Sequence, residues 1–259
     1  MELSYRQQQI MNAARAAGRV EVEAMAAELS VTPQTIRRDL NELCARRLLA
    51  RVHGGAVLAS ALANLAYDAR RMMAAEAKEQ IGRICAEAIP DGASLFINIG
   101  TTTEAVARAL GNRRDMLVIT NNLNIANIMA ANPQCDVVVA GGMLRRSDGG
   151  LVGESTIDMV RQFKADYAVI GASAVDDDGT LLDFDYREVR VSQAIIANAR
   201  KTFLVADSSK FARSAPVRIA DMGSIDAFFT DRVTSPALRE VCQDNGVVLY
   251  ETAAGEDTP

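Results

Sequence analysis

Apolar segments that alternate with helical ones constrain the fold of this 259-residue chain more than any other feature. From Glu76 onward most of the apolar segments are continuous, as expected for strands that are buried on both faces of a sheet. The predicted strands are residues 94–100, 116–122, 135–142, 166–173, 202–207 and 226–231. The predicted helices between them are Thr103–Leu110, Leu123–Ala131, Ser155–Phe163 and Glu188–Ala199. This alternation predicts the α/β class, with a mainly parallel sheet and helices on both of its faces.

Polar residues gather where these strands end. "NIGTTTEAVARAL" reads as a strand, Gly100, three threonines and a helix, while "TNN" (120–122), "AGGMLRRSDGGLVGES" (140–155) and "DSSK" (207–210) follow other strands. Ligands bind outside the carboxyl ends of parallel strands, and a glycine before a helix N-terminus suits an anion. A Thr-capped helix after a strand is also ordinary structure, but several such ends in one sheet favour an anion site. Neither a P-loop nor a GxGxxG motif is present.

Three short helices are predicted before residue 50, the first over about Ser4–Ala17. In the second, apolar residues fall at i, i+3, i+4 and i+7, the spacing of one buried face: Val22, Met25, Ala26 and Leu29. The third starts at Thr32, because Thr is a preferred N-cap and Pro33 then occupies a position where its missing N–H does no harm. The buried side of this third helix carries Ile36, Leu40 and Leu43.

The open side of the third helix predicts a contact with DNA. Two short helices joined by a tight turn form a helix-turn-helix, whose second helix can enter the major groove. Opposite the buried side lie Gln34, Arg38, Asn41 and Glu42, with Thr35 and Arg37 beside them. Arginine pairs with guanine and glutamine with adenine, and each good pair gives about 1–3 kcal/mol of discrimination. A solvated helix face is the alternative interpretation of the same residues.

A hairpin signal after the third helix favours the DNA-binding interpretation. "LLARVHGGAVL" (48–58) places two apolar segments around Gly54-Gly55, as expected of the wing in a winged helix-turn-helix, where Arg51 and His53 can contact phosphate. Residues 1–55 hold eight arginines, no lysine and six acidic residues, a charge of +2, whereas the remaining 20 basic and 27 acidic residues give −7. The candidate DNA-binding residues are Thr32, Gln34, Thr35, Arg37, Arg38, Asn41, Arg51 and His53.

These N-terminal signals together resemble a known family. "TPQTIRRDLNEL" followed by "RVHGGA" is similar to the N-terminal signature of DeoR-type bacterial transcription repressors. Residues 75–235 resemble the sensor domain of that family, which is similar to the phosphosugar isomerase and coenzyme A transferase fold. The likeness extends over roughly residues 4–232. It implies a repressor that binds double-stranded operator DNA and is released by a phosphorylated sugar or polyol.

The resemblance also implies roles for the residues at the strand ends. The loop Gly100–Thr103 is expected to hold the phosphate of the effector, and Lys210 to balance its charge. Arg145 and Arg146 are further options for that charge, with a solvated loop as their alternative, while Glu188 and Asp207 are expected to accept ligand hydroxyls. The candidate effector-binding residues are Asn98, Gly100, Thr101, Thr102, Thr103, Asn121, Gly141, Gly142, Arg145, Glu154, Glu188, Asp207 and Lys210.

The effector is expected to be glycerol 3-phosphate. "GTTTEAVARAL", "TNNLNIAN", "AGGMLRRSDGGLVGE" and "LLDFDYREVR" resemble the branch of the family that responds to this compound. One departure concerns the phosphate loop, because this chain has Asn98 where the family typically has Asp. The exchange removes a carboxylate near the phosphate, which by charge alone eases anion binding. It equally changes a hydroxyl contact or a hydrogen bond that shapes the loop.

The remaining features predict the organisation and setting of the chain. We expect a DNA-binding domain at residues 1–55, a connection at 56–74, a sensor domain at 75–251 and a polar tail at 252–259. Four scattered cysteines, no secretory leader and no apolar stretch of about 18 residues predict a cytoplasmic protein without membrane contact. A single histidine argues against His-rich metal sites, and no cofactor is predicted.

One small helix-turn-helix makes few base contacts, so a homodimer or homotetramer on repeated half-sites is expected. Two alternatives to the glycerol 3-phosphate repressor remain at this point. One is a repressor of the same family with another sugar phosphate as effector. The other is a sugar-phosphate isomerase that uses Glu188, Asp185 or Asp183 as its general base.

Overall fold

The structure is a computed structural model, and it describes residues 3–17, 19–46, 48–52, 54–58, 67, 69–211 and 213–252. For residues 15–17, 19, 50–52, 57 and 58 it describes the backbone alone. The chain divides into two compact units, residues 1–69 (unit 1) and residues 70–259 (unit 2).

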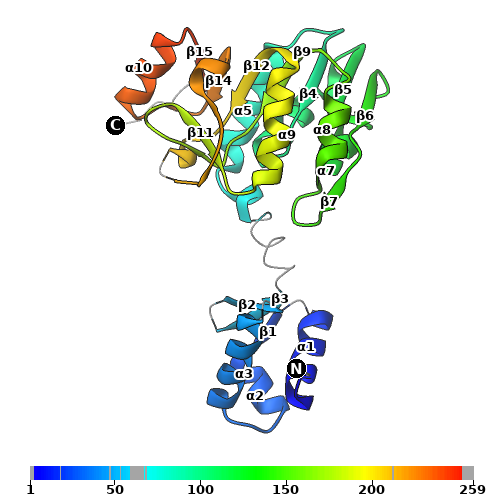
Figure 1. The fold of residues 1–259 in the computed structure, drawn as a ribbon, viewed down its shortest axis with the longest axis vertical. Helices are drawn as coiled ribbons and strands as arrows, with labels where there is room; N and C mark the ends of the chain where they lie inside the picture. The colour runs from blue at the N-terminus through cyan, green and yellow to red at the C-terminus, as the bar shows by residue number, and fades with distance from the viewer. Residues whose placement is uncertain are drawn as a thin grey trace. The chain divides into compact units, whose positions relative to one another are not determined.

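Unit 1 is a winged helix-turn-helix (Figure 1). Its helices are α1 (Tyr5–Ala17), α2 (Val22–Glu28) and α3 (Pro33–Ala45), and its strands are β1 (Arg19–Glu21), β2 (Leu49–Val52) and β3 (Gly55–Leu58). β2 and β3 form the predicted antiparallel wing hairpin, and β3 also pairs with β1. β1 was not predicted, because three residues are too few to show a strand period.

The core of unit 1 consists of the apolar positions that the helical spacing predicts. Ile10 of α1 and the three residues of the α3 stripe are fully buried, namely Ile36, Leu40 and Leu43. Ala56 of β3 joins the same core, so strand pairing continues past the expected domain boundary. The expected boundary at residue 55 therefore has to move to Leu58. It was placed too early because alanine is depleted in strands and the residues after Gly55 are rich in it.

The expected connection at 56–74 is also shorter at its other end. Residues 69–72 are helical, and unit 2 begins at residue 70. Residues 59–66 and 68 of this connection, and residues 253–259 of the expected tail, lie outside the described residues.

Unit 2 is built on a seven-stranded sheet in which every described pair of neighbours is parallel. The strand order is β15-β14-β12-β9-β4-β5-β6. The strands are β4 (Ser94–Ile97), β5 (Met116–Thr120), β6 (Cys135–Val139), β9 (Ala165–Ile170), β12 (Ala199–Val205), β14 (Ala227–Thr230) and β15 (Val248–Glu251). All six predicted strands are confirmed, and the edge strand β15 was missed. The chain proceeds from β4 outward to β6 and then from β9 outward to β15, so the direction reverses between β4 and β9. Open α/β sheets bind their ligands at such a point.

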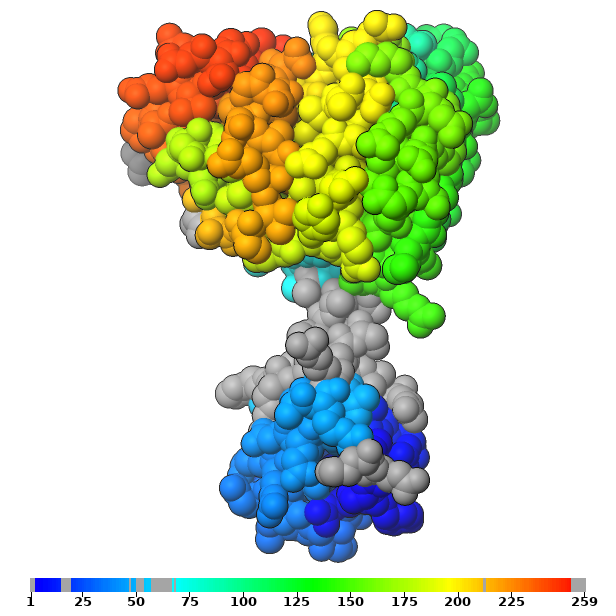
Figure 2. Space-filling view, in the orientation of Figure 1, coloured from blue at the N-terminus to red at the C-terminus, as the bar shows by residue number. Residues whose placement is uncertain are grey.

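Helices cover both faces of this sheet. α5 (Ala75–Glu87), α6 (Thr101–Ala109) and α7 (Leu123–Met129) pack on one face, and α8 (Glu154–Val160), α9 (Tyr186–Ala197) and α10 (Pro236–Asp244) on the other. Successive residues of β4 show the division: Leu95 and Ile97 belong to the first core, and Phe96 to the second. α8 and α9 lie side by side on the surface shown in Figure 2. The continuous apolar strands are thus buried on both faces, as predicted.

Smaller elements complete unit 2. β7 (Met143–Arg145) and β8 (Gly150–Val152) form a hairpin, and β10 (Ala174–Val175), β11 (Thr180–Asp183) and β13 (Val217–Asp221) form an antiparallel sheet. Single 3₁₀ turns lie at Leu110–Asn112, Ser208–Lys210 and Met222–Ser224. Strands this short carry too little period to be predicted. Among the described residues, no helix combines the length and the apolar character needed to cross a bilayer.

Candidate functional site

Helix α3 begins where the sequence predicts, at the N-cap Thr32. The Thr32 Oγ1 accepts a hydrogen bond from the Thr35 N–H at 3.3 Å, and the two hydroxyl oxygens are 2.9 Å apart. Both threonine hydroxyls take part in the cap, and the DNA contact predicted for them stays a prediction. Asp39, buried on the inner side of α3, accepts hydrogen bonds from the Arg6 guanidinium of α1. This ion pair joins α1 to α3.

The outer side of α3 carries the other predicted DNA-binding side chains, and all of them are exposed: Gln34, Arg37, Arg38 and Asn41. Arg37 pairs with Glu23 of α2 at 3.3 Å, and Arg38 pairs with Glu42 at 3.5 Å. The Arg38 side chain remains 84% exposed. Exposed pairs of this kind are worth at most about 1 kcal/mol, so DNA can replace the carboxylates at little cost. The side chain of Arg51 and the whole of His53 lie outside the described residues.

In unit 2, Gly171 marks the region where the ends of three strands come together. It directly follows β9, and a Cβ placed on it would lie 3.8 Å from the Val205 carbonyl and 3.9 Å from the Ile99 carbonyl. The loop after β4 and the turn after β12 therefore open into the same region, at the point where the strand order reverses. The structure thus brings Gly100 and Asp207 to one site.

Helix α6 starts with free backbone donors at this site. Gly100 is its N-cap and supplies no side-chain cap, so the N–H groups of Thr101, Thr102 and Thr103 have no partner within the helix. Gly100 adopts a φ of 154°, and a Cβ there would lie 3.2 Å from the Thr103 Oγ1. The unpaired N–H groups and the helix dipole together favour an anion in front of α6.

Thr103 builds this loop instead of presenting its side chain to a ligand. It is fully buried, and its hydroxyl donates to the carbonyls of Asn98 and Gly100 at 2.7 and 2.8 Å. Its predicted part in ligand binding is therefore confined to its N–H group.

Asn98 also shapes the loop. It is 1% exposed, donates from Nδ2 to the Ser192 Oγ at 2.7 Å, and accepts at Oδ1 from the Ile99 N–H at 2.8 Å. The Ser192 hydroxyl in turn donates to the Glu188 carbonyl at 3.1 Å. Because the Ser192 hydroxyl proton is used in that bond, the Ser192 oxygen can only accept from residue 98. The amide of Asn98 can donate to it, whereas an ionised carboxylate cannot. Asn98 therefore makes a hydrogen bond that shapes the loop, which is one of the consequences predicted for the exchange of Asp for Asn.

Two asparagines follow β5, and they differ in role. Asn121 donates to the Leu151 carbonyl at 3.2 Å, while its Oδ1 is buried without a hydrogen-bond partner in the described part of the chain. Asn122, which was not among the predicted site residues, caps α7 through Oδ1 and donates to the Asp148 carbonyl at 3.0 Å. Asn121 therefore has the spare acceptor, and Asn122 holds the β7–β8 hairpin in place.

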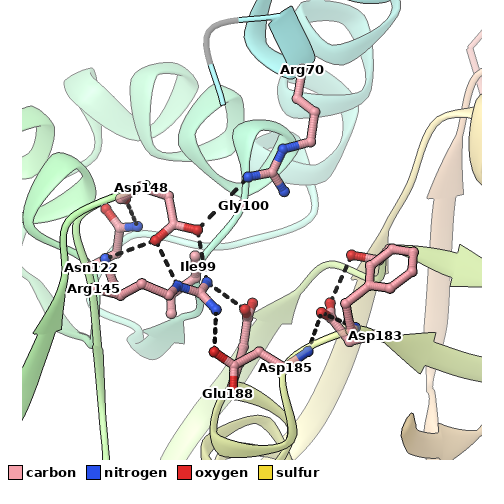
Figure 3. Close-up of polar contacts among 12 residues, drawn as sticks. Arg70, Ile99, Gly100, Asn122, Arg145, Asp148, Asp183, Asp185 and Glu188 are labelled. Carbon is pink, nitrogen blue, oxygen red and sulfur yellow. Dashed lines mark hydrogen bonds and ion pairs between the residues drawn. The ribbon is translucent and has the colours of Figure 1, made fainter. Parts of the chain in front are cut away.

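Arg145 at the end of β7 lies among three carboxylates (Figure 3). It donates to both oxygens of Asp148, at 2.9 and 2.7 Å, to Asp185 at 3.2 Å, and to Glu188. Burial opposes its charge, but Glu188 and Asp148 outweigh burial and raise the Arg145 pKa. Its charge is balanced within the protein and its side chain is only 18% exposed, so it does not lie in a solvated loop. Its predicted contact with the phosphate stays a prediction. Arg146 is exposed, as the solvated-loop alternative expects.

Glu188 stands at the start of α9, where two carboxylates influence each other. Its pKa is raised to about 7, first by burial and then by the nearby Asp183, while Arg145 acts in the opposite direction. Asp183 is held by the Ser173 hydroxyl at 2.9 Å and by the Phe184 N–H at 2.6 Å. Asp148, Asp183 and Asp185 were not among the predicted effector ligands. Asp148 lies three residues from Arg145 and Asp185 three from Glu188, but only the tertiary fold brings the two segments together.

The turn after β12 holds polar atoms that lack partners. Asp207 is 1% exposed; its Oδ1 accepts from the Ser209 N–H at 3.1 Å, but its Oδ2 and the Ser209 Oγ are buried without a partner among the described residues. The Lys210 ammonium likewise has no described hydrogen-bond or ion-pair partner. Burial lowers the Lys210 pKa to about 8, Asp207 raises it, and Arg213, Lys78 and Arg70 lower it.

Three predicted residues lie apart from this cluster. The Gly141 carbonyl accepts from the Thr156 hydroxyl of α8 at 2.7 Å, and a Cβ on Gly142 would overlap that same hydroxyl. These glycines let the chain pass close to α8. Glu154 is exposed and pairs with Arg190 at 3.8 Å. Among the described residues, none of the three contacts the Gly100 loop or Lys210.

A separate hollow lies at the opposite edge of the sheet. It is lined by the amino ends of β12, β14 and β15, including Lys201, Asp226 and Tyr250. None of its lining residues holds an unpartnered buried side-chain atom in the described part of the chain. The site at the carboxyl ends therefore remains the candidate.

Comparisons with known proteins agree with this division into two units. The model of the DeoR-like helix-turn-helix domain matches residues 6–61, and the model of the DeoR C-terminal sensor domain matches residues 73–232.

Curated relatives match over nearly the whole length. The glycerol-3-phosphate regulon repressor of Escherichia coli K12 is 44% identical over 249 residues, which cover 96% of this chain and 99% of that one. The protein of the same description from Haemophilus influenzae is 46% identical over 233 residues, 90% of this chain and 91% of that one. The HTH-type transcriptional repressor CsqR of E. coli K12 is 40% identical over 232 residues, 90% and 89% of the two chains.

Solved structures are more distant. Ribose 5-phosphate isomerase A from Methanocaldococcus jannaschii matches with a TM-score of 0.41 and 16% identity, over 54% of this chain and 55% of that one. Similarity at this level supports no functional conclusion.

Proposed function

Because the chain belongs to the DeoR family of transcriptional repressors, we propose that glycerol 3-phosphate is its effector and that effector binding releases the operator. The two relatives described as glycerol-3-phosphate regulon repressors support this choice, since they share 44 and 46% of their residues with the chain over nine-tenths or more of its length. The alternative is a repressor of the same family that responds to another sugar phosphate, and it differs from this proposal only in the identity of the effector.

The unpartnered atoms around α6 and β12 carry the proposal. The Lys210 ammonium and the Ser209 hydroxyl are donors without described partners, and they lie in the region onto which the free N–H groups of α6 open. A phosphate dianion accepts hydrogen bonds from all of these donors and balances the charge of the lysine. Asn121 and Asp207, each with an unpartnered oxygen, can accept the hydroxyls of the glycerol part.

Operator binding is assigned to the exposed side of α3 and to the wing. Gln34 and Arg38 read bases in the major groove, and the neighbouring residues contact phosphate. The chain acts in the cytoplasm as a homodimer or homotetramer, with half-sites about 34–36 Å apart or at multiples of that spacing. An effector that couples to DNA with about 1–3 kcal/mol changes operator affinity by roughly 5–150-fold.

We assign no catalytic activity to the sensor unit. Of the three carboxylates considered as a general base, Glu188 and Asp185 accept hydrogen bonds from Arg145. Asp183 accepts from the Ser173 hydroxyl and the Phe184 N–H, and these contacts support a structural and binding role for all three. Assays for aldose–ketose interconversion on phosphorylated sugars test this assignment, and turnover of any of them would contradict it.

Thermal unfolding tests the effector. The wild-type chain is heated alone and with glycerol 3-phosphate, glycerol or a panel of hexose phosphates. A ligand at about 100 times its dissociation constant stabilises the native state by roughly 2.7 kcal/mol, so we expect a higher melting temperature with glycerol 3-phosphate and no change with glycerol. A shift with a hexose phosphate alone would replace the effector and leave the repressor assignment intact.

A pair of variants locates the site. Lys210→Met should abolish the shift caused by glycerol 3-phosphate. Lys201→Met, which removes an exposed lysine near the start of β12, the strand that precedes the turn of Lys210, should retain it. An undiminished shift in Lys210→Met would exclude this lysine from the site.

A further inference from the structure

Residues 70–73, which precede α5, are attached to the candidate site through Asp148, Lys78 and Arg213. The Arg70 guanidinium lies 3.8 Å from the Asp148 carboxylate (Figure 3). The buried Lys78 ammonium of α5 donates to the carbonyls of Arg70 and Met73, the latter at 2.6 Å. The Arg213 guanidinium, beyond β12, donates to the Met73 sulfur at 3.0 Å. All of these contacts lie within unit 2. Residue 70 is also the first residue of that unit, directly after the end of unit 1 at residue 69.

The cations that make these contacts are those that surround Lys210. Arg70, Lys78 and Arg213 all lie close enough to Lys210 to act on its charge, and Asp207 is the carboxylate that opposes them there. Lys78 in turn experiences Asp207, Arg213 and Arg70. The four cations outnumber the two buried carboxylates near them, Asp207 and Glu104, and a phosphate dianion in their midst relieves the repulsion between the cations. The position proposed for the phosphate is therefore built in part from residues 70–73.

Asp148 connects the same segment to the other end of the site. Its Oδ2 is the oxygen that Arg70 approaches, and the same oxygen accepts from Arg145 at 2.7 Å. Arg145 satisfies both oxygens of Asp148 without help. Arg70 is the more distant of the two arginines from Asp148, and its side chain is 41% exposed. Its guanidinium can leave Asp148 without stranding a buried charge.

Ala74, which joins this segment to α5, has an unfavourable backbone conformation. It lies between the helical residues 69–72 and α5, and its φ of 51° is in the left-handed region that residues other than glycine rarely adopt. Its carbonyl accepts from the Lys78 N–H at 3.0 Å, so one lysine holds both sides of the joint. Backbone conformations of this kind persist only where their surroundings enforce them, which is typical of switch regions.

We propose that Arg70 carries the effector signal out of the site: its guanidinium exchanges Asp148 for the phosphate of the effector and thereby moves residues 70–73. This inference rests on the proposed function, because it takes a phosphorylated effector as its ligand. Arginine is suited to the role, since its planar fork matches phosphate and carboxylate equally. Sequence reasoning missed this residue, because Arg70 lies in an Ala-rich stretch with no motif.

The experiment compares Arg70→Ala with Arg71→Ala, an exposed arginine next to it with no described partner. Calorimetry gives the dissociation constant of glycerol 3-phosphate for each chain. Fluorescence anisotropy gives the dissociation constant of a DNA fragment selected on the wild-type chain, without effector and at saturation. The ratio of these two DNA constants measures the coupling and does not depend on how tightly each variant binds DNA.

We expect a ratio of about 5–150 in the wild type and in Arg71→Ala. In Arg70→Ala the effector should bind more weakly, and at saturation the ratio should fall to within twofold of one. A wild-type ratio in Arg70→Ala at saturation would overturn the inference and leave the effector assignment standing. Failure of glycerol 3-phosphate to bind the wild-type chain is a different result, which refutes the proposed effector and this inference with it.

Hydrogen exchange keeps the test independent of the folding of any variant. Saturation of the wild-type chain with glycerol 3-phosphate should change the exchange rates of the amides in residues 69–74, whereas the amides of α10, remote in the chain from the site, should exchange as before. Unchanged exchange in residues 69–74 of the saturated wild type would overturn the inference.

Discussion

Replacing Lys210 with methionine should make the repressor more stable while it destroys effector binding. Burial lowers the Lys210 pKa from 10.5 to about 8, with Arg213, Lys78 and Arg70 adding to the effect against the attraction of Asp207. At 1.36 kcal/mol per pH unit, this difference corresponds to about 3 kcal/mol of unfavourable free energy in the charged form. Solvent reaches part of the side chain, so we reduce the expected gain to about 1–3 kcal/mol. Methionine matches the length of the lysine stem and carries no charge.

The pH dependence identifies the cause of the gain. The folded chain loses the Lys210 proton near pH 8, and the unfolded chain keeps it until about pH 10.5. The unfavourable charge is therefore fully present below pH 8, and the stability of the wild type should rise as the pH increases from 8 to 10.5. The advantage of Lys210→Met should accordingly be largest at neutral pH and vanish near pH 10.5.

Thermal unfolding followed by circular dichroism measures this difference. For a domain of 150–250 residues, 1 kcal/mol shifts the melting temperature by about 2–4 °C, so Lys210→Met should melt roughly 2–12 °C higher at pH 7. Lys201→Met serves as the control and should change stability by no more than about 0.5 kcal/mol, because that lysine is exposed. If Lys210→Met melts at or below the wild-type temperature at pH 7, the ammonium already has a counter-charge, and the reasoning that makes it an open phosphate ligand is wrong.

Three further predictions test other parts of the molecule. Burial raises the Glu188 pKa from 4.5 to about 7, so the folded chain keeps a proton that the unfolded chain releases; wild-type stability should fall by about 2–3 kcal/mol as the pH rises through this range, and melting curves of Glu188→Gln should lack that fall. Arg38→Ala should weaken operator binding by about 1–3 kcal/mol and relax the preference for one base in a binding-site selection, whereas Arg200→Ala, which changes an exposed arginine of unit 2, should do neither. Gly142→Ala should lower stability by about 1–3 kcal/mol in urea unfolding, because its Cβ would overlap a buried hydroxyl, whereas Gly111→Ala has open space around it and should not.

The features that were predicted correctly from the sequence are those that depend on neighbours in the chain. The start of α3 follows from Thr32 and Pro33, and its buried face follows from a period of 3.6 residues. The six predicted strands of the parallel sheet were found because strands buried on both faces are continuously apolar, and helices separate them along the chain. β15 was missed: it lies at the sheet edge, and Val248 and Tyr250 are exposed, so it lacks the fully apolar character of a central strand.

The site was predicted less completely than the fold, because its contacts join distant parts of the chain. Arg145 was assigned to the phosphate on account of its charge, but Asp185 and Glu188, about forty residues further along, take up that charge. Asn98 was recognised as a departure from the family, yet its consequence became visible only through Ser192, which packs against it from α9. No local pattern reports such partners, so charge and strand ends alone identify a region and not the roles within it.

The charged residues at the strand ends are unevenly distributed across the site. Four cations lie near the segment that precedes α5 and the turn after β12, together with the buried Asp207 and Glu104: Arg70, Lys78, Lys210 and Arg213. Four further carboxylates lie near α9 and the β7–β8 hairpin, around Arg145: Asp148, Asp183, Asp185 and Glu188. A ligand that is anionic at one end and rich in hydroxyls at the other matches this division, and glycerol 3-phosphate has that character. Arg145 neutralises the carboxylates of the second group, so its displacement would leave buried carboxylates without their partner. Removing one partner of a buried ion pair costs about 3–5 kcal/mol, so we expect Arg145 to stay with its carboxylates when an anionic ligand binds.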